Sequence, residues 1–211
     1  MSSSQVFADR EAGGRRLARA LAGRTWTDPL VLGLARGGMP VAAVVARWLG
    51  AELDVAVARK IGAPGRPEFG VGAVTPHGPA IYSDESLRIL HLTAGELART
   101  ENRERAEARR RLERYRGGRA PVVCAGRDVI LVDDGLATGV TARAALRDLR
   151  AGNPLTMVFA APVCAPGAAA LLPEADDVVS VVEPPEFRAV GQWYADFRQT
   201  RDEEVLALLA R

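Results

Sequence analysis

Short, continuous apolar runs recur along the chain, and segments with apolar residues at helical spacing lie between them. Uninterrupted apolar runs are typical of strands that are buried on both faces of a parallel sheet. They predict core strands over Leu30–Ala35, Leu53–Ala58, Val129–Val132, Leu155–Ala161 and Val178–Val182. The helical spacing predicts helices over about Arg10–Leu21, Val41–Leu49, Thr93–Tyr115, Val140–Arg150, Gly167–Leu172 and Asp202–Leu209. Strands that alternate with helices indicate an α/β fold, here a Rossmann-like three-layer domain with a parallel central sheet.

The middle of the chain departs from this alternation. Ile61–Phe69 is rich in glycine and proline and predicts a loop. Val71–Thr75 and Ala80–Tyr82 predict two short strands of a hairpin. We expect a helical insertion over about 84–118 to follow, most of it one long charged helix.

That long helix begins with a capping-box pattern at Thr93 and Glu96. Acids precede arginines by four residues along it, which favours ion pairs on an exposed helix face. An alternative interpretation is a basic surface for RNA. Charge runs are more often solvated faces, so we expect no nucleic-acid partner.

Composition narrows the class of protein. The chain has 211 residues and a net charge of +2, which suits one soluble domain and indicates no particular polyanionic partner. Cys124 and Cys164 adjoin apolar runs and predict buried free thiols in a reducing compartment. The N-terminal residues lack a signal-peptide pattern and no apolar run reaches membrane-spanning length, so we expect a cytoplasmic protein.

The candidate chemistry centres on residues 128–143, DVILVDDGLATGVTAR. A buried strand ends at two carboxylates, Asp133 and Asp134, and a small-residue loop then opens a helix. Backbone amides at a helix N-terminus bind anions, whereas adjacent carboxylates suit sugar hydroxyls or a shared Mg²⁺. The pattern therefore predicts a sugar phosphate ligand. The alternative, helix capping by the acids, would be a costly use of two carboxylates at a buried strand end.

Two further loops carry cations at strand ends. Arg36-Gly37-Gly38 follows the first predicted strand, and Arg59-Lys60 follows the second. The carboxyl ends of parallel strands share one edge of the sheet, so these cations and the acid pair should face the same ligand.

The motif VILVDDGLATGVT closely resembles the phosphoribosyl-pyrophosphate (PRPP) motif of the type I phosphoribosyltransferases. This resemblance implies that Asp133 and Asp134 bind the ribose hydroxyls and that Ala137–Thr141 cradle the 5′-phosphate. LVLGLARGGMPVA resembles the pyrophosphate loop of that family, which often carries a non-proline cis peptide, here expected near Ala35-Arg36. The Arg-Lys pair resembles that of the adenine and orotate enzymes and implies diphosphate contact, with a mobile lid following it.

The resemblance thus assigns a PRPP site and its chemistry. The expected PRPP-binding residues are Arg36, Gly37, Gly38, Arg59, Lys60, Asp133, Asp134, Gly135, Leu136, Ala137, Thr138, Gly139, Val140 and Thr141. Those expected to be catalytic are Arg36, Lys60, Asp133 and Asp134, with Mg²⁺ as cofactor. A nitrogen nucleophile would displace pyrophosphate, and the protein would be a pentosyltransferase of nucleotide salvage.

The sequence leaves the identity of the nitrogen acceptor undetermined. The residue that is an aspartate in 6-oxopurine enzymes is Ala137 here, so a hypoxanthine–guanine activity is disfavoured. Near the C-terminus lies a cluster of four aromatic residues, Phe187, Trp193, Tyr194 and Phe197, which could stack on a base or could equally pack the segment onto the core. The first three are the tentative acceptor-binding residues. Asp196 resembles a metal–pyrophosphate ligand of the 6-oxopurine enzymes but is one residue out of register. Asp196 and Glu68 are weak candidates for a general base.

We expect a single domain with a core over about 28–183 and a small hood from about 1–27 and 184–211. A homodimer without membrane association is expected, with PRPP, pyrophosphate and a nucleobase or other nitrogen acceptor as ligands. The alternative function is a regulatory protein that binds PRPP without turnover and that could bind RNA. The cations at the two loops favour the enzyme, because a sensor needs fewer leaving-group contacts.

Overall fold

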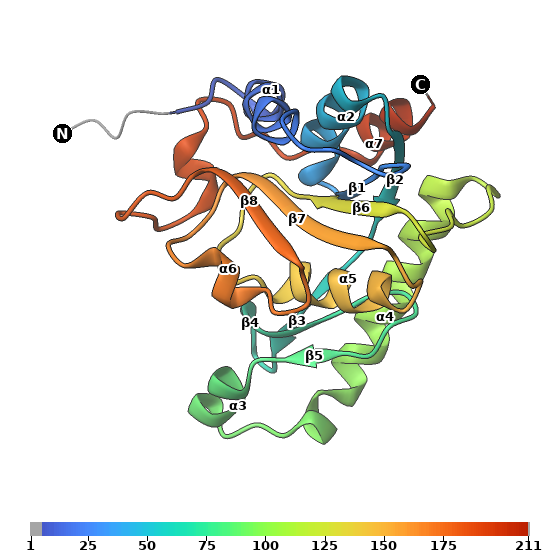
Figure 1. Ribbon diagram of the computed structural model, residues 1–211. Coiled ribbons are helices and arrows are strands. Elements are labelled where there is room, and N and C mark those ends of the chain that lie inside the picture. The colour runs from blue at the N-terminus through green and yellow to red at the C-terminus, as the bar shows by residue number, and fades with distance from the viewer. Residues whose placement is uncertain (1–5, 211) are drawn as a thin grey trace.

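A parallel sheet forms the centre of the protein. The computed structural model describes residues 6–210, so the ends of the predicted hood, residues 1–5 and 211, lie outside the described residues. The strands lie in the order β2-β1-β6-β7-β8, all parallel (Figure 1). Their bounds are β1 Leu30–Leu34, β2 Glu52–Ala56, β6 Asp128–Val132, β7 Thr156–Val163 and β8 Asp177–Val182. The predicted α/β fold with a parallel sheet is confirmed.

Helices cover both faces of this sheet, as Figure 1 shows. Alternate residues of each strand point to opposite faces, which is why the central strands are apolar throughout. Leu131 and Phe159 pack toward α5 (Val140–Arg150) and α6 (Ala168–Leu171). Ile130 and Val158 pack toward α1 (Arg10–Leu21) and α2 (Gly38–Leu49). The result is the predicted three-layer arrangement.

Helix α1 belongs to this layered core. Its residues Leu17, Ala18 and Leu21 are fully buried against α2 and the sheet. This packing differs from the expected hood, in which residues 1–27 lay outside the core. The N-terminus of α1 is capped by Asp9, whose carboxylate accepts a hydrogen bond from the amide of Ala12.

A second, antiparallel sheet lies beside the first, with strands in the order β3-β4-β5. Its bounds are β3 Arg59–Ala63, β4 Arg66–Val74 and β5 Ile81–Tyr82. The predicted loop over Ile61–Phe69 is therefore wrong: most of it is a β-hairpin. Its glycines and prolines are accommodated at the turn, where Gly65 has a φ of 71°, and at two register shifts around Gly62. The pairing of β4 with β5 confirms the hairpin predicted from Val71–Thr75 and Ala80–Tyr82.

Helices α3 (Asp84–Leu90) and α4 (Ala94–Arg116) complete this smaller unit. The capping box of Thr93 and Glu96 is confirmed. Arg105 pairs with Glu101 at 2.7 Å and also donates to the backbone oxygens of Thr75 and Gly78. Other arginines of the helix pair with Glu107 and with the first turn of α7. These arginines are bound to the protein's own groups, as expected of the ion-paired helix face.

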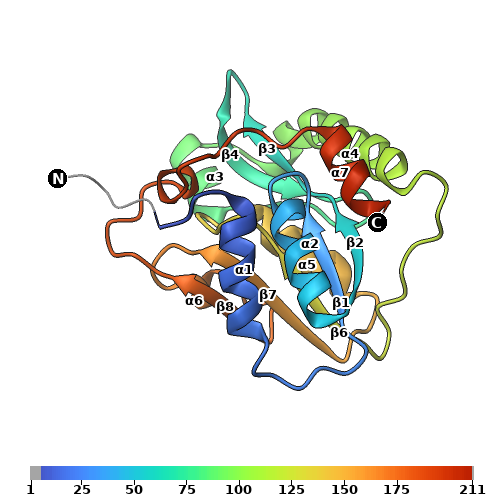
Figure 2. The same cartoon turned by 90° about the horizontal axis from the view of Figure 1, so that it is seen from above.

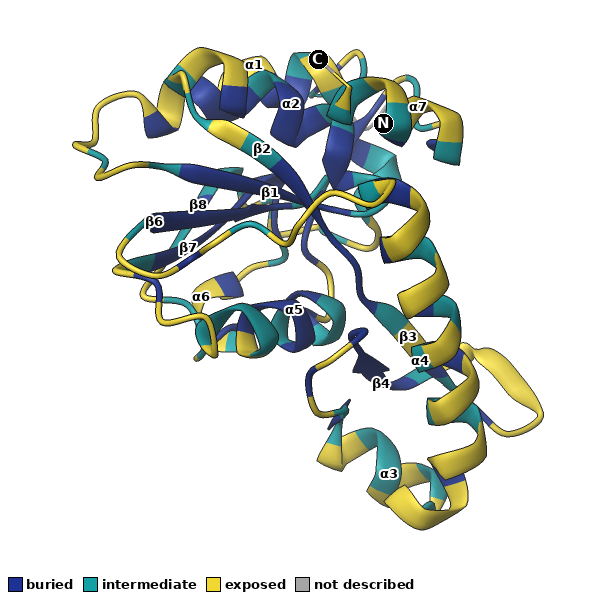
Figure 3. Ribbon diagram, turned by 90° about the vertical axis from the view of Figure 1, so that its right-hand side faces the viewer, coloured by how far each residue is buried: buried dark blue, intermediate teal, exposed yellow. Residues whose placement is uncertain are grey.

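The C-terminal part of the chain returns across the carboxyl edge of the parallel sheet. It contains a 3₁₀ helix, η1 (Val190–Trp193), and ends in α7 (Asp202–Leu209), which packs against α2, β2 and α4. Figure 2 shows this red segment running past the N-terminal ends of α1 and α2. Figure 3 shows α4 extending from the antiparallel sheet back toward α7. Within residues 6–210, none of the helices has both the length and the apolar character that crossing a membrane requires.

Candidate active site

The loops after β1 and β6 meet at the point where the order of the parallel strands reverses. The chain leaves β1 toward β2 on one side, and leaves β6 toward β7 on the other. Ligands of open α/β sheets bind at such points, outside the carboxyl ends of the strands. A cavity of about 320 Å³ lies here, which we call the acid-pair cavity. Its lining is Arg10, Leu34, Ala35, Arg36, Gly37, Ala58, Asp133, Asp134, Thr141, Phe197, Gln199 and Thr200.

The two glycines of the first loop let it lie directly against the acid pair. A Cβ on Gly37 would collide with the carboxylate of Asp134. A Cβ on Gly38 would lie 2.9 Å from the Cα of Asp133 and closer still to the backbone oxygen of Val132. The Ala35–Arg36 peptide bond is cis, as the resemblance implied. The sequence RGG is therefore what brings the β1 loop into contact with the β6 loop.

We predict that Gly38→Ala lowers the free energy of unfolding by about 1–3 kcal/mol, because its Cβ meets backbone atoms of β6 that cannot move aside. Urea unfolding followed by circular dichroism measures this. Gly23→Ala is the matched control, since a Cβ at Gly23 would have no neighbour within 4 Å in the described part of the chain. Equal stability of the two variants would contradict the proposed packing of the loops.

The carboxyl groups of Asp133 and Asp134 lie beside each other, and the protein encloses both of them. Burial, together with the neighbouring charge of Asp134, raises the pKa of Asp133 well above its usual value. Burial also raises the pKa of Asp134, although the nearby Arg10 opposes the rise. The amide of Asp134 donates to Oδ1 of Asp133 at 2.8 Å. Hydroxyl donors or a bound cation would stabilise the charged form of such a pair.

The second half of the motif builds the start of α5. Gly139 has a φ of 74° and immediately precedes the helix, and Thr141 lines the acid-pair cavity. Ala137 and Thr138 are exposed. Leu136 has a different role, because its side chain is buried and its amide donates to the backbone oxygen of Val163. The amides available to an anion are thus those that follow Leu136.

The cationic residues divide between two cavities. Arg36 lines the acid-pair cavity, with its Nη1 3.5 Å from Oδ1 of Asp202. Arg59 and Lys60 line a neighbouring cavity of about 590 Å³ beside the β3–β4 hairpin. Arg59 donates to Glu104 of α4 at 2.7 and 3.0 Å, and Nζ of Lys60 donates to the backbone oxygen of Glu68. The structure therefore brings Arg36, but not the Arg-Lys pair, to the acids.

The C-terminal aromatic residues also divide. Trp193 and Tyr194 are buried with Phe7, and Phe187 packs against the same cluster. The hydroxyl of Tyr194 donates to the backbone oxygen of Asp134 at 2.6 Å. Trp193 and Tyr194 therefore pack the segment onto the core, the second of the two interpretations left open. Phe187 is half-buried, and its stacking on a base stays a prediction. Phe197 is the aromatic residue that lines the acid-pair cavity.

One residue that contacts the acid pair was not identified by the sequence analysis. Arg10, at the start of α1, pairs with Oδ2 of Asp134 through both Nε and Nη2, each at 2.8 Å. The two residues are 124 positions apart, and no local motif connects them. The only indication was indirect: two enclosed carboxylates require a cation from somewhere in the fold.

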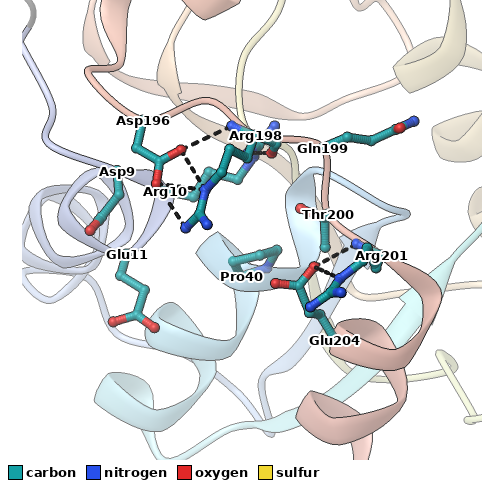
Figure 4. Close-up of a pocket in the computed structure, with 10 residues that line it drawn as sticks. All are labelled: Asp9, Arg10, Glu11, Pro40, Asp196, Arg198, Gln199, Thr200, Arg201 and Glu204. Carbon is teal, nitrogen blue, oxygen red and sulfur yellow. Dashed lines mark hydrogen bonds and ion pairs between the residues drawn. The ribbon is translucent and has the colours of Figure 1, made fainter.

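Arg10 lines both the acid-pair cavity and a second cavity of about 460 Å³ between α1 and the C-terminal segment, shown in Figure 4. Asp196 lies in this second cavity, where its carboxylate pairs with Arg198 at 2.9 Å, and this pairing lowers its pKa. Asp196 is thus not among the residues that line the acid-pair cavity. Within the described residues, no three His, Cys, Asp or Glu side chains cluster as metal ligands.

Comparison with known proteins gives this site a family context. A model of the phosphoribosyl transferase domain matches residues 2–197. Two curated relatives, from strains CDC 1551 and H37Rv of Mycobacterium tuberculosis, are each 43% identical over 208 residues. Both carry the name "Putative phosphoribosyl transferase". The matched region is 98% of this chain and 47% of each relative, so the chain spans about half the length of these relatives.

Two solved structures are similar to this chain. The crystal structure of TT1426 from Thermus thermophilus is 45% identical, with a TM-score of 0.79 over 96% of this chain and 97% of that one. A hypothetical protein from Neisseria gonorrhoeae, solved with bound ppGpp, is 13% identical with a TM-score of 0.53, over 90% of this chain and 85% of that one. At that identity the likeness concerns the fold alone.

Proposed function

We propose, from the premise that this chain belongs to the phosphoribosyl transferase domain family, that it binds Mg-PRPP and transfers the phosphoribosyl group to a nitrogen acceptor, with release of pyrophosphate. One observation carries this proposal: the acid pair, the start of α5 and Arg36 all line or border one cavity at the reversal point of the sheet. That combination suits a ligand with a polyol, a phosphate and a leaving group of high negative charge.

The β6 loop would bind the phosphoribosyl part. Carboxylates accept hydrogen bonds from ribose hydroxyls. Asp133 and Asp134 line the cavity, so both could accept such bonds from a bound ribose. The 5′-phosphate would lie against the backbone amides of Ala137–Thr141, where the N-terminus of α5 adds its partial positive charge. The hydroxyls of Thr138 and Thr141 supply further donors.

The β1 loop would bind the leaving group. During transfer the bond from C1 of the ribose to a pyrophosphate oxygen breaks and its electron pair leaves with pyrophosphate. The acceptor nitrogen bonds to C1 and releases its proton to solvent. Negative charge grows on the departing pyrophosphate while the sugar becomes cationic. Arg36 would stabilise the first charge, and the acids would favour the second. A contact of Arg59 and Lys60 with the diphosphate stays a prediction, because their side chains line the neighbouring cavity.

The donor set fits Mg²⁺ that is bound jointly with the ligand. Mg²⁺ in phosphate sites is commonly held by one or two carboxylates, with ligand oxygens and water completing the shell. Asp133 and Asp134 are two such carboxylates on one cavity wall. The ion would neutralise pyrophosphate charge when bound. A role for Asp196 as a third ligand stays a prediction, because its carboxylate pairs with Arg198.

The test is incubation with Mg-PRPP and a panel of nucleobases and amines, followed by measurement of pyrophosphate release. We expect release with one nitrogen acceptor, a nucleobase first, and the variant Asp133→Asn as the matched blank. Oxopurines are the less favoured bases, because Ala137 cannot accept a proton. Tight PRPP binding without release across the panel would contradict the enzyme and favour the regulatory protein. Absence of binding would contradict both.

A further inference from the structure

Arg10 lines the acid-pair cavity and connects it to other parts of the chain through its hydrogen bonds. Its Nε and Nη2 donate to one oxygen of Asp134, and its Nη1 donates to the backbone oxygen of Arg198 at 2.7 Å. Its guanidinium carbon lies 4.0 Å from the centre of the Phe197 ring. All three nitrogens are thus engaged, and the side chain is only 11% exposed. A charged group held this completely is pre-organised rather than a chance surface pair.

The contacts of Asp134 show what this arrangement does to the acid pair. Its carboxylate lies between the guanidinium of Arg10 and the Cα of Gly37, where any side chain would collide with it. Its backbone oxygen accepts the hydroxyl of Tyr194. Asp134 is therefore bound by α1, by the β1 loop and by the C-terminal segment at once.

Asp133 is held differently. Its Oδ1 accepts the amide of Asp134, whereas within residues 6–210 no hydrogen bond or ion pair engages Oδ2. Because Asp133 also lines the cavity, this oxygen is available to a ligand. Oδ1 of Asp134 likewise has no hydrogen bond among the described residues, so the two acids differ in charge pairing instead: Asp134 forms an ion pair with Arg10, whereas Asp133 accepts only a backbone amide.

We propose that Arg10 is the positioning residue of the acid pair: it holds Asp134 as a brace between α1, the β1 loop and the C-terminal segment, and so leaves Asp133 as the main acceptor for the ligand's hydroxyls. This inference rests on the proposed function and deepens it. Arg10 acts on the ligand through Asp134. The same side chain fixes Phe197, which lines the cavity, and the backbone oxygen of Arg198, which directly precedes the lining residue Gln199.

The test is a set of double-mutant cycles in which calorimetry measures the Kd for Mg-PRPP. Asp133→Asn should raise Kd by about a hundredfold, because the ligand's hydroxyls lose a charged hydrogen-bond acceptor. Asp134→Asn should raise Kd by about tenfold or less, because this carboxylate acts mainly through its ion pair with Arg10. Arg10→Gln should raise Kd by about tenfold, because it leaves the Asp134 carboxylate without its cation. Arg10→Lys should recover part of this loss.

The cycles separate positioning from a general loss of structure. Arg10→Gln with Asp134→Asn should have the Kd of Asp134→Asn alone, because both changes act on one ion pair. Arg10→Gln with Asp133→Asn should show the product of the two single effects. Arg15→Gln is the matched control, since Arg15 lies on the same helix with its side chain 54% exposed. Multiplying effects in the first pair, or an unchanged Kd in Arg10→Gln, would overturn the inference.

Failure of the proposed function is visible separately, in the unsubstituted protein. If that protein does not bind PRPP, both the proposed function and the proposed contact of Asp133 with the ligand's hydroxyls are disproved. The bracing is still tested by urea unfolding of the same variants. Arg10→Gln should lower the urea midpoint, and adding Asp134→Asn should restore part of it by removing the uncompensated carboxylate. A further fall in the double variant would overturn the bracing as well.

Discussion

Replacing Asp133 and Asp134 together by asparagine is expected to weaken the binding of Mg-PRPP by about a hundredfold or more. Each hydrogen bond from a ribose hydroxyl to a carboxylate contributes about 1.5–3 kcal/mol, and both carboxylates lose their charge in this variant. Two asparagines keep the shape of the acids, so the loops should retain their packing. Calorimetric titration with Mg-PRPP measures the loss.

The fold of the double variant should remain intact. Neutralisation removes the repulsion between two buried carboxylates, which offsets part of the loss of the ion pair between Arg10 and Asp134. We expect an unchanged far-UV circular dichroism spectrum and a urea midpoint that falls little. An unchanged affinity for PRPP would disprove the assignment of the site, and a collapsed spectrum would show that the acids serve the fold instead.

The second large effect is expected for Arg36→Ala. If Arg36 meets the charge that grows on the leaving pyrophosphate, its removal should lower kcat by about a hundredfold to a thousandfold, as the loss of one transition-state donor does elsewhere. The Kd for PRPP should change by less than about tenfold, because that contact is weaker before the bond breaks. Steady-state kinetics with the acceptor found in the panel, together with calorimetry, separates the two quantities.

Two controls bear on Arg36→Ala. Arg47→Ala removes an exposed arginine from α2 and should change neither quantity. Asp202→Asn weakens the 3.5 Å contact between Asp202 and Arg36 while leaving the arginine in place, so kcat should fall far less than in Arg36→Ala. Equal losses of kcat and affinity in Arg36→Ala would make this residue a ground-state ligand rather than a catalytic one.

Much of the site was predictable because its chemistry is local in the chain. The acid pair, Gly139 and the start of α5 follow one another directly, and the Arg36-Gly37-Gly38 loop is equally compact. The order of strands and helices sufficed to bring these two loops to one edge of the sheet, because consecutive parallel strands place their carboxyl ends together. The cis peptide at Ala35–Arg36 followed from the resemblance and is present.

Predictions that depended on side-chain direction were less successful. Arg59 and Lys60 do follow β2, but they begin a hairpin that packs beside α4. There Arg59 forms an ion pair with Glu104. The aromatic residues near the C-terminus were correctly seen as a cluster, but only their packing shows that Trp193 and Tyr194 are buried while Phe197 faces the cavity. A pattern of residue types does not specify which partner each side chain finds.

The sequence by itself determined the layered α/β fold, the acid-pair motif and the glycine loop, because each depends on periodicity or on neighbours along the chain. Only the tertiary structure decided that Arg10 holds Asp134, that the Arg-Lys pair lies in a neighbouring cavity and that the two acids are unequal. The physical reason is that an ion pair forms wherever folding brings opposite charges together out of water. Residues 124 positions apart meet there without any local signal.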